Sequence, residues 1–298
     1  MKNIQKNILP FLVIVFLSVN ATCQSQTSSI TDSNVKKEKK KKRKKKYKLP
    51  KIDLSHWKVT LPVGKPDEVS PPEILDYANN DVLKKYMYND STSGALVFYA
   101  FPGSQTANTK YSRSELREQM VPGDNSVNWT FEQGGKMRGR LKMGEISRDK
   151  NGKYHKTIIM QIHGRLTNEQ RDLIGQKDNN APPILKIYWK NGKVRVKTKV
   201  LKNPNASNTE ILRTDAWTDD KGYTFKEEVG FKKFTLEVKV TKGKMVISLN
   251  DNEFAVYKDI NIKRWGVFEN YFKAGNYLGT KDKNGFAKVM YYELNVSH

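Results

Sequence analysis

Three short segments of the sequence carry side chains that could do chemistry on a charged substrate. The first, YSRSELREQM, places Arg113, Glu115 and Arg117 at every second position. Side chains of a β-strand point alternately to opposite faces, so in a strand these three charged groups share one face. Such a row meets only solvent on an open face. On a concave face it predicts a site for anions, because Arg binds carboxylates through two parallel hydrogen bonds.

A second segment, TIIMQIHG, holds Gln161 and His163 two positions apart. In a strand both side chains point to one face, while Met160 and Ile162 point to the other. A neutral amide donor and an imidazole would therefore lie side by side over an apolar underside. One interpretation is a hydrogen-bonded polar pair at a strand end, and the other is part of a catalytic site. The charged row of the first segment favours the second interpretation.

A third segment, ENYFKAGNYLGT, places Tyr271, Lys273, Gly275 and Tyr277 on one face by the same alternation, with Asn276 on the other face. A Lys and two Tyr suit a sugar-binding surface, and a ligand could approach closely at the Gly. The alternative is ordinary aromatic packing near the end of a strand. The choice depends on how the fold places the three segments.

Short strands are the elements that must position these residues. From residue 51 onward the chain contains many alternating apolar and polar runs, separated by turns rich in Gly, Asn, Asp and Lys. KNGK (190–193) and TKGK (241–244) predict hairpin turns, and one short helix is predicted within 71–87. Many short strands with little helix predict an all-β fold, a single β-sandwich of the concanavalin-like jelly-roll type.

Charge and composition narrow the choice of partner. The 298-residue chain has a formal net charge of +23 and 37% hydrophobic residues, enough for a sizeable core. The run KKEKKKKRKKKYK, Lys36–Lys48, holds eleven basic residues and one acid. A basic surface attracts polyanions, whether nucleic acid, membrane or acidic polysaccharide. No P-loop, GxGxxG, EF-hand or zinc-type spacing occurs in the sequence, so we expect neither a cofactor nor a metal.

The first residues predict export. Residues 1–21 combine a Lys-flanked start, an apolar run from Ile8 to Val19 and small residues before a cleavage site, as in a secretory signal peptide. The apolar run is too short to span a membrane. Cys23 is the single cysteine, which excludes an internal disulfide. It would attach the chain to a membrane only if it is lipidated.

Residues 22–48, rich in Ser and Thr and then in Lys, predict a disordered tether, and residues 49–298 predict a single catalytic domain. The Lys run is either a solvated spacer or an electrostatic holder of a polyanion. We expect the tether to be dispensable for catalysis. Export and the lack of a basic-aromatic motif argue against nucleic acid as a partner.

Together, the blocks RSELR, QIH and YFKAGNY resemble three motifs of the alginate lyases of polysaccharide lyase family 7, in the same order and at similar separations. LSHWKVTLPVG (54–64) is similar to the opening strand of that family, and the resemblance covers residues 50–298. The chain departs from the pattern at Gly279, where the family commonly has Gln. The resemblance implies a secreted enzyme that cleaves the acidic polysaccharide alginate by β-elimination, giving 4,5-unsaturated oligouronates, and we expect a monomer.

Elimination removes the C5 proton beside a carboxylate, which must first be neutralised. The resemblance implies Arg113 as the chief neutraliser, with Gln161 as a neutral donor to the same oxygens. It implies that Tyr277 returns a proton to the leaving oxygen, with a pKa lowered by positive neighbours. His163 would act as base or as carboxylate neutraliser, depending on the uronate epimer. The implied substrate contacts are Glu115, Arg117, Lys273, Tyr271 and Asn276.

Glu115 is expected to orient Arg113 and Arg117, and Arg117 to bind either a neighbouring sugar carboxylate or Glu115. A glycoside hydrolase is an alternative, but it needs two carboxylates with one kept protonated, and Glu115 between two Arg stays ionised. A non-catalytic module for acidic glycans would not need His163 and Tyr277 together. The sequence leaves endo or exo action open. It also leaves open mannuronate or guluronate preference, with a lean to guluronate from the Ile between Gln and His.

Overall fold

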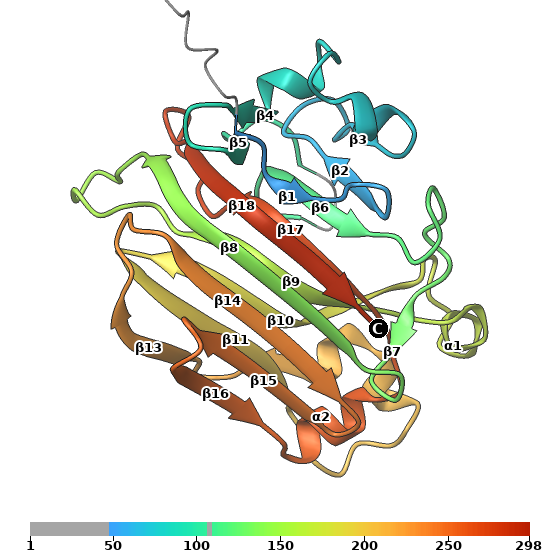
Figure 1. Cartoon of the computed structure of the whole chain (residues 1–298). Coiled ribbons are helices and arrows are strands. Elements are labelled where there is room, and N and C mark those ends of the chain that lie inside the picture. The colour runs from blue at the N-terminus through green and yellow to red at the C-terminus, as the bar shows by residue number, and fades with distance from the viewer. Residues whose placement is uncertain (1–47, 106–108) are drawn as a thin grey trace, which may run out of the picture. The chain divides into compact units, whose positions relative to one another are not determined.

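Two β-sheets packed face to face form the part of the chain that the computed structural model describes, residues 48–105 and 109–298 (Figure 1). Strand pairs in these residues are antiparallel, apart from β1, which runs parallel to β18. The prediction of an all-β sandwich with few short helices is confirmed. The expected signal peptide, Cys23 and the tether up to residue 47 lie outside the described residues.

The first sheet has eight strands. Seven of them follow the order β16, β15, β14, β8, β18, β5, β4, and β1 pairs with β18. Their bounds are β1 Lys51–Ile52, β4 Met87–Asp90, β5 Ala95–Ala100, β8 Gly135–Ile146, β14 Phe234–Thr241, β15 Lys244–Leu249, β16 Glu253–Tyr257 and β18 Ala287–Ser297.

The second sheet has ten strands and carries the segments of interest. Its order is β12, β11, β10, β9, β17, β6, β2, β3, with β13 beside β11 and β7 beside β17. The bounds are β2 Trp57–Thr60, β3 Glu68–Val69, β6 Arg113–Glu118, β7 Trp129–Thr130, β9 Thr157–Arg165, β10 Asn180–Lys190, β11 Lys193–Leu201, β12 Trp217–Asp219, β13 Tyr223–Glu228 and β17 Glu269–Leu278.

The helices are short. They are η1 Glu73–Asp76, η2 Leu83–Lys85, α1 Asn168–Leu173, η3 Glu210–Leu212, η4 Thr214–Ala216 and α2 Ile260–Trp265. The prediction of one helix within 71–87 is wrong, because that region forms η1 and η2 with a turn between them. In the turn, Asn80 Oδ1 accepts hydrogen bonds from the N–H groups of Val82 and Leu83, both at 3.0 Å. An Asn side chain that captures backbone donors in this way favours a turn over a continuing helix. None of the helices in the described ranges has the length and apolar character that crossing a membrane requires.

The core lies between the two sheets and follows the predicted alternation. In β14, FTLEVKVT, the alternate side chains that face the core are Phe234, Leu236, Val238 and Val240. Burying an apolar side chain of this size stabilises the fold by about 1.5–3 kcal/mol. Between the neighbouring strands β5 and β18 of the first sheet, Phe98 and Tyr291 pack edge to face with ring centroids 5.7 Å apart. The second face of each strand is therefore free to carry polar side chains.

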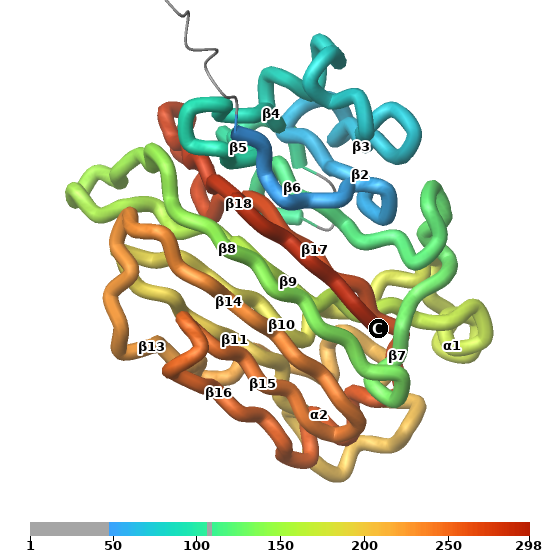
Figure 2. The backbone as a smooth tube through the Cα atoms, viewed as in Figure 1, coloured from blue at the N-terminus to red at the C-terminus, as the bar shows by residue number. Residues whose placement is uncertain are grey.

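Both predicted hairpin turns are confirmed. Lys190 pairs with Lys193 across KNGK, where Asn191 and Gly192 have φ angles of 48° and 84°. Two consecutive positive φ angles are typical of the turn that best matches strand twist, and Asn and Gly adopt them at low cost. This turn joins β10 to β11, and the turn at 241–244 joins β14 to β15; the backbone path can be followed in Figure 2.

The strand order brings the three segments together. RSELR lies on β6, QIH on β9 and YFKAGNY on β17, and β9, β17 and β6 are consecutive neighbours in the ten-stranded sheet. Lys273 pairs with Gln161 across the β17–β9 ladder, and Tyr277 pairs with Arg113 across the β17–β6 ladder. Residues opposite each other in a ladder share a face, so these four side chains lie on one side of the sheet.

Candidate active site

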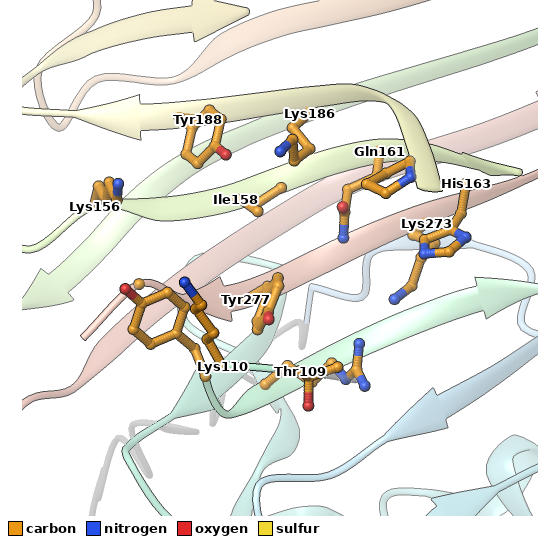
Figure 3. Close-up of a pocket in the computed structure, with 14 residues that line it drawn as sticks. Thr109, Lys110, Lys156, Ile158, Gln161, His163, Lys186, Tyr188, Lys273 and Tyr277 are labelled. Carbon is orange, nitrogen blue, oxygen red and sulfur yellow. The ribbon is translucent and has the colours of Figure 1, made fainter. Parts of the chain in front are cut away.

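One face of β6, β9 and β17 forms the wall of a pocket of about 270 Å³, called here the active-site pocket (Figure 3). The four residues predicted to be catalytic, Arg113, Gln161, His163 and Tyr277, all line it, and so does Lys273. Figure 3 shows Gln161, His163 and Lys273 gathered together, with Tyr277 beside them. The pocket therefore unites polar groups that lie far apart in the sequence.

Glu115 lies under the pocket wall and holds three of these groups. Its side chain is 1% exposed. Oε1 accepts a hydrogen bond from Gln161 Nε2 at 2.6 Å, and Oε2 forms an ion pair with Lys273 Nζ. Oε2 also lies 3.8 Å from Arg113 Nη1, so Glu115 pairs with Arg113 as expected. Because Glu115 is buried, its assignment as a substrate contact is corrected: it positions the groups that reach the pocket.

His163 is held in a single tautomer. Its Nδ1 lies 3.0 Å from the carbonyl oxygen of Gly164, which can only accept, so Nδ1 carries the proton and Nε2 keeps a lone pair. Burial, then the positive charge of Lys273, lowers the pKa of His163 to about 3. The imidazole is therefore neutral at ordinary pH. Of the two predicted roles, the structure favours the base over the cationic neutraliser.

Tyr277 keeps its phenolic proton in the free protein. Burial raises its pKa above the ordinary value, while Arg113 and the backbone amides of Tyr111 and Lys110 act in the opposite direction. The guanidinium of Arg113 lies 5.4 Å from the ring centroid. The expected lowering of this pKa is wrong for the free protein, because lost hydration outweighs the nearby positive charge. A protonated Tyr is a proton donor, which is the form that a leaving oxygen requires.

Comparison with known proteins agrees with this geometry. A family model described as Alginate lyase matches residues 52–298. The chain belongs to the alginate lyase family. It is thus a polysaccharide lyase that cleaves alginate.

Relatives of this alginate lyase include proteins of known structure. An alginate lyase of Klebsiella pneumoniae is 25% identical over 303 residues, which cover 83% of this chain and 90% of that protein. The crystal structure of family 7 alginate lyase A1-II′ in complex with product (GGG) is 28% identical, with a TM-score of 0.67, over 83% of this chain and 96% of that chain. An alginate lyase from Pseudomonas aeruginosa, 23% identical, has the same fold with a TM-score of 0.59, over 83% and 100% of the two chains.

In this alginate lyase Arg117 lies beside the pocket, on the face of β6 that also carries Arg113 and Glu115. Its guanidinium carbon lies 4.1 Å from the ring centroid of Tyr271, and the side chain is 6% exposed. The guanidinium donates to the carbonyl oxygen of Glu118 at 2.5 Å and to two oxygens of the loop 125–128 at 2.7 and 3.0 Å. Among the described residues, the ion pairs of Glu115 are with Arg113 and Lys273, so the predicted alternative in which Arg117 pairs with Glu115 is wrong.

Tyr271 lies between Arg117 and the imidazole of His163. Its ring stacks on His163 with centroids 5.2 Å apart and planes inclined by 13°. The residues that line the pocket in the described structure include neither Tyr271 nor Arg117. Both were expected to contact substrate. Tyr271 is half-buried and stacks on His163, so it restricts the orientation of that ring, while the expected substrate contacts of Tyr271 and Arg117 stay predictions.

Two predictions on β17 are corrected. Asn276 was expected to contact substrate, but it is fully buried between the sheets. Its Oδ1 accepts from Thr157 Oγ1 at 2.7 Å, and its Nδ2 donates to the Ala287 carbonyl at 2.7 Å. Gly275 was expected to admit a ligand, but it approaches β6 instead. Its φ is 137°, and a Cβ there would lie 2.7 Å from the carbonyl oxygen of Ser114.

Sequence reasoning missed three residues that line the pocket from the β9 side: Lys156, Lys186 and Tyr188. Lys186 pairs with Gln161 across the β10–β9 ladder, and its ammonium binds both oxygens of Asp219 at 2.8 and 2.9 Å. The alternation of ILKIYW does place Lys186 and Tyr188 on one face of β10. The missing information was that β10 lies next to the QIH strand.

The pocket neutralises anions through its own side chains. Arg113 and Lys273 supply positive charge there, and Gln161 supplies a neutral donor. Within residues 48–105 and 109–298, no group of three or more His, Cys, Asp and Glu side chains could hold a metal ion. Catalysis without a metal or cofactor stays a prediction.

The charge of the Lys273 ammonium sets an upper pH for substrate binding by the pocket. Burial, and to a lesser extent the charge of Arg113, lowers the pKa of Lys273 to about 8, although Glu115 acts to raise it. Above that pH the free enzyme loses a positive charge that attracts the substrate carboxylate. We therefore expect kcat/KM on alginate to fall as pH rises through about 8, since this parameter reports the free enzyme.

The variant Lys273→Arg should move this fall of kcat/KM, the alkaline limb of the pH profile, to higher pH, because a guanidinium stays charged. The quantity measured is the pH at which kcat/KM falls to half of its maximum, and this pH does not depend on how active the variant is. Lys58→Arg, another nearly buried Lys in an ion pair with Glu68, is the matched control and should leave the limb in place. A limb unchanged by Lys273→Arg would assign it to another group.

Proposed function

We propose that the active-site pocket cleaves alginate by β-elimination, leaving a 4,5-unsaturated uronate at the new chain end. The observation that carries the proposal is the cluster around Glu115. One buried carboxylate gathers Arg113, Lys273 and Gln161 on the wall that also presents His163 and Tyr277. Structures of the relative A1-II′ in complex with product (GGG) and with substrate (GGMG) support binding of such chains by this fold.

The first task of the site is to neutralise the uronate carboxylate. Arg113 lines the pocket, and its buried Nε has no hydrogen-bond partner among the described residues. Lys273 adds positive charge and Gln161 adds a neutral donor beside it. When the C5 proton leaves, negative charge moves onto the carboxylate oxygens. Donors already in place stabilise that charge more in the transition state than in the ground state.

His163 Nε2 then takes the C5 proton. In the free enzyme its basicity is suppressed by burial and by the charges of Lys273, Arg113 and Arg117. A bound carboxylate offsets these charges, so substrate binding itself raises the basicity of the imidazole. The tautomer set by the Gly164 carbonyl leaves Nε2 ready to accept the proton.

Tyr277 completes the reaction as the acid. The electron pair of the broken C5–H bond forms the C4=C5 double bond as the C4–O4 bond breaks. The phenolic proton of Tyr277 passes to the departing oxygen, which stays on the neighbouring sugar. Arg113 and the amides of Tyr111 and Lys110 stabilise the phenolate that remains. Proton transfer from the imidazolium to the phenolate, directly or through water, restores both groups.

A glycoside hydrolase would need a carboxylic acid in the pocket that protonates the leaving group. Hydrolysis of a glycoside needs two carboxyl groups that flank the scissile bond. Among the described residues that line the pocket there is no Asp or Glu, and Glu115 is buried beneath the wall in contact with three partners. A binding module would use the positive groups, but it would not need a neutral base opposite a protonated Tyr.

The test of the proposal uses defined mannuronate and guluronate blocks. The wild type should produce the ultraviolet absorbance of the unsaturated uronate, and its absence on every block would refute β-elimination.

If His163 is the base for one epimer, His163→Ala should abolish cleavage of guluronate blocks and spare part of the activity on mannuronate blocks. His56→Ala, in which the lost ring binds only the backbone of Gln119, is the control for general damage. Equal losses on both blocks would show that His163 serves both epimers.

Export of the chain is a second proposal, supported by the Lys-flanked apolar run of residues 1–21. The mature protein should begin just after Ala21, or at a lipidated Cys23. The measurement is the mass of the N-terminal peptide of the protein recovered outside the cytoplasm. An intact Met1 on that protein would contradict the proposal.

A further inference from the structure

The active-site pocket extends beyond the catalytic residues to a second positive group, Lys156. Along β9 and the residue before it, the pocket is lined in turn by His163, Gln161, Ile158 and Lys156, and Ile158 pairs with Tyr277. Figure 3 shows Lys156 and Tyr188 together at the far side of Ile158 from His163. Lys156 lies two residues from Ile158, about 7 Å along the strand, so the pocket continues past the residue that pairs with Tyr277.

Gly279 lies directly against Lys156. The N–H of Gly279 donates to the Lys156 carbonyl at 2.8 Å, where β17 and β9 end side by side. A Cβ added at Gly279 would lie 3.0 Å from Lys156 Cγ and 3.3 Å from its Cε. The stem of the Lys side chain thus lies over the glycine, in space that a side chain at position 279 would compete for. The position of the Lys156 side chain therefore depends on the absence of a side chain at Gly279.

The charge of Lys156 is available to a ligand. Lys186, its neighbour in the pocket, is bound by Asp219, whereas Lys156 makes no ion pair in the described part of the chain. Its Nζ lies 5.7 Å from the ring centroid of Tyr188. Burial lowers the pKa of Lys156, the charges of Lys190 and Lys197 act in the same direction, and the charge of Asp219 acts in the opposite direction. An anion bound at Lys156 would relieve the repulsion from Lys190 and Lys197.

We propose that Lys156, held over Gly279 and flanked by Tyr188, binds the carboxylate of the uronate that departs with the leaving oxygen. This rests on the proposed elimination. The carboxylate beside the C5 proton lies at Arg113 and Gln161, and the leaving oxygen lies at Tyr277. The next sugar on the leaving side then extends toward Lys156. Lys156 is therefore a specificity-determining residue: it selects chains with a carboxylate at that position and fixes which bond lies at Tyr277.

The experiment compares Lys156→Met with Lys190→Met on alginate and on defined oligouronates. Both variants remove one positive charge from the same region, but Lys190 does not line the pocket in the described structure. Because Lys156 is solvent-exposed, we expect a rise in KM of about fivefold in Lys156→Met, the scale of an exposed ion pair. The kcat should stay within about twofold, the bond cleaved in an oligouronate should shift, and Lys156→Arg should restore both.

A double-mutant cycle tests the role of Gly279. Gly279→Ala adds only the Cβ, so it should raise KM in the wild-type background by displacing Lys156. In the Lys156→Met background it should have no further effect. The difference between Lys156→Met and wild type should also shrink as salt is raised, since ions screen an exposed pair. Thermal unfolding of each variant confirms that the fold is intact.

The outcomes separate this inference from the proposed reaction. If the wild type forms no unsaturated product, the proposed elimination fails. If the wild type is active but Lys156→Met matches Lys190→Met in KM and cleavage pattern, the subsite is overturned and the elimination stands. A fall in kcat with unchanged KM in Lys156→Met would also overturn the subsite, because it would place Lys156 in the chemical step.

Discussion

Tyr277→Phe should lower kcat on alginate by about 10²–10⁴-fold, the usual range for loss of an acid–base group. The change removes one hydroxyl and keeps the ring that packs beside Arg113 and Tyr111. KM should change little, because the carboxylate donors are untouched. Initial rates from the absorbance of the unsaturated product measure the effect.

Tyr223→Phe provides the control for loss of a tyrosyl hydroxyl as such. That hydroxyl donates to Glu253 Oε1 at 2.8 Å, on β13 and away from the pocket lining. It should leave kcat close to the wild-type value. Near-normal turnover in Tyr277→Phe would show that another group protonates the leaving oxygen, and the role assigned to Tyr277 would fall.

Glu115→Gln should damage both the reaction and the fold. Removing this carboxylate leaves the buried ammonium of Lys273 without its partner, and breaking a buried ion pair costs about 3–5 kcal/mol. Glu115 raises the pKa of Lys273, so without it that pKa falls further below its present value of about 8. Less of Lys273 would then be charged at neutral pH, and the donors that Glu115 holds would lose their positions, so kcat/KM should fall by about 10²-fold, the cost of losing one group that stabilises developing charge.

The sign of the pH effect on stability follows from this pKa. In Glu115→Gln the loss of unfolding free energy should be largest at pH values where the wild-type carboxylate is ionised and Lys273 of the variant is still charged, and smaller at high pH, where Lys273 can become neutral. Urea unfolding at several pH values measures this. Glu68→Gln breaks the half-exposed pair with Lys58 and should cost no more than about 1 kcal/mol. Equal losses in the two variants would mean that Glu115 is not the organising group.

Period-two alternation was enough to predict most of the catalytic face. Arg113, Gln161, His163 and Tyr277 were each placed on a strand face from the sequence, and the structure brings those faces into one pocket. Asn276 shows the limit of resemblance. Alternation places it on the face opposite to Tyr277, the resemblance implied a substrate contact, and the buried amide agrees with alternation.

The rest of the site depends on long-range pairing that no local pattern contains. The buried position of Glu115 under Gln161 and Lys273 requires β6 to lie beside β17, and β17 beside β9. The hydrogen bonds between Arg117 and the loop 125–128 require the chain after β6 to turn back toward β17, where β7 pairs. Neither strand order nor loop path follows from hydrophobic periodicity, because many orders satisfy the same alternation.

Lys156 was missed for a different reason. Strict alternation from Gln161 toward the N-terminus would turn Thr157 to the pocket and Lys156 to the core. The ladder shifts register beside Ile158, both against β10 and against β17. The shift exchanges the faces, so Ile158 and Lys156 line the pocket while Thr157 binds Asn276 in the core. A bulge of this kind is not readable from residue types.

This register shift divides the active site into two halves that can change independently in evolution. Lys156 lies five positions from Gln161, so it reaches the pocket only because the shift is present. Loss of the shift without a change of length would turn Ile158 and Lys156 toward the core, while Gln161 and His163 kept their places. Removal of one residue between Ile158 and Gln161 would instead give regular alternation and keep Ile158 and Lys156 on the pocket side. The side chains that would meet the departing sugar can therefore be exchanged by a change of register at one point of the strand, with no change in the residues themselves.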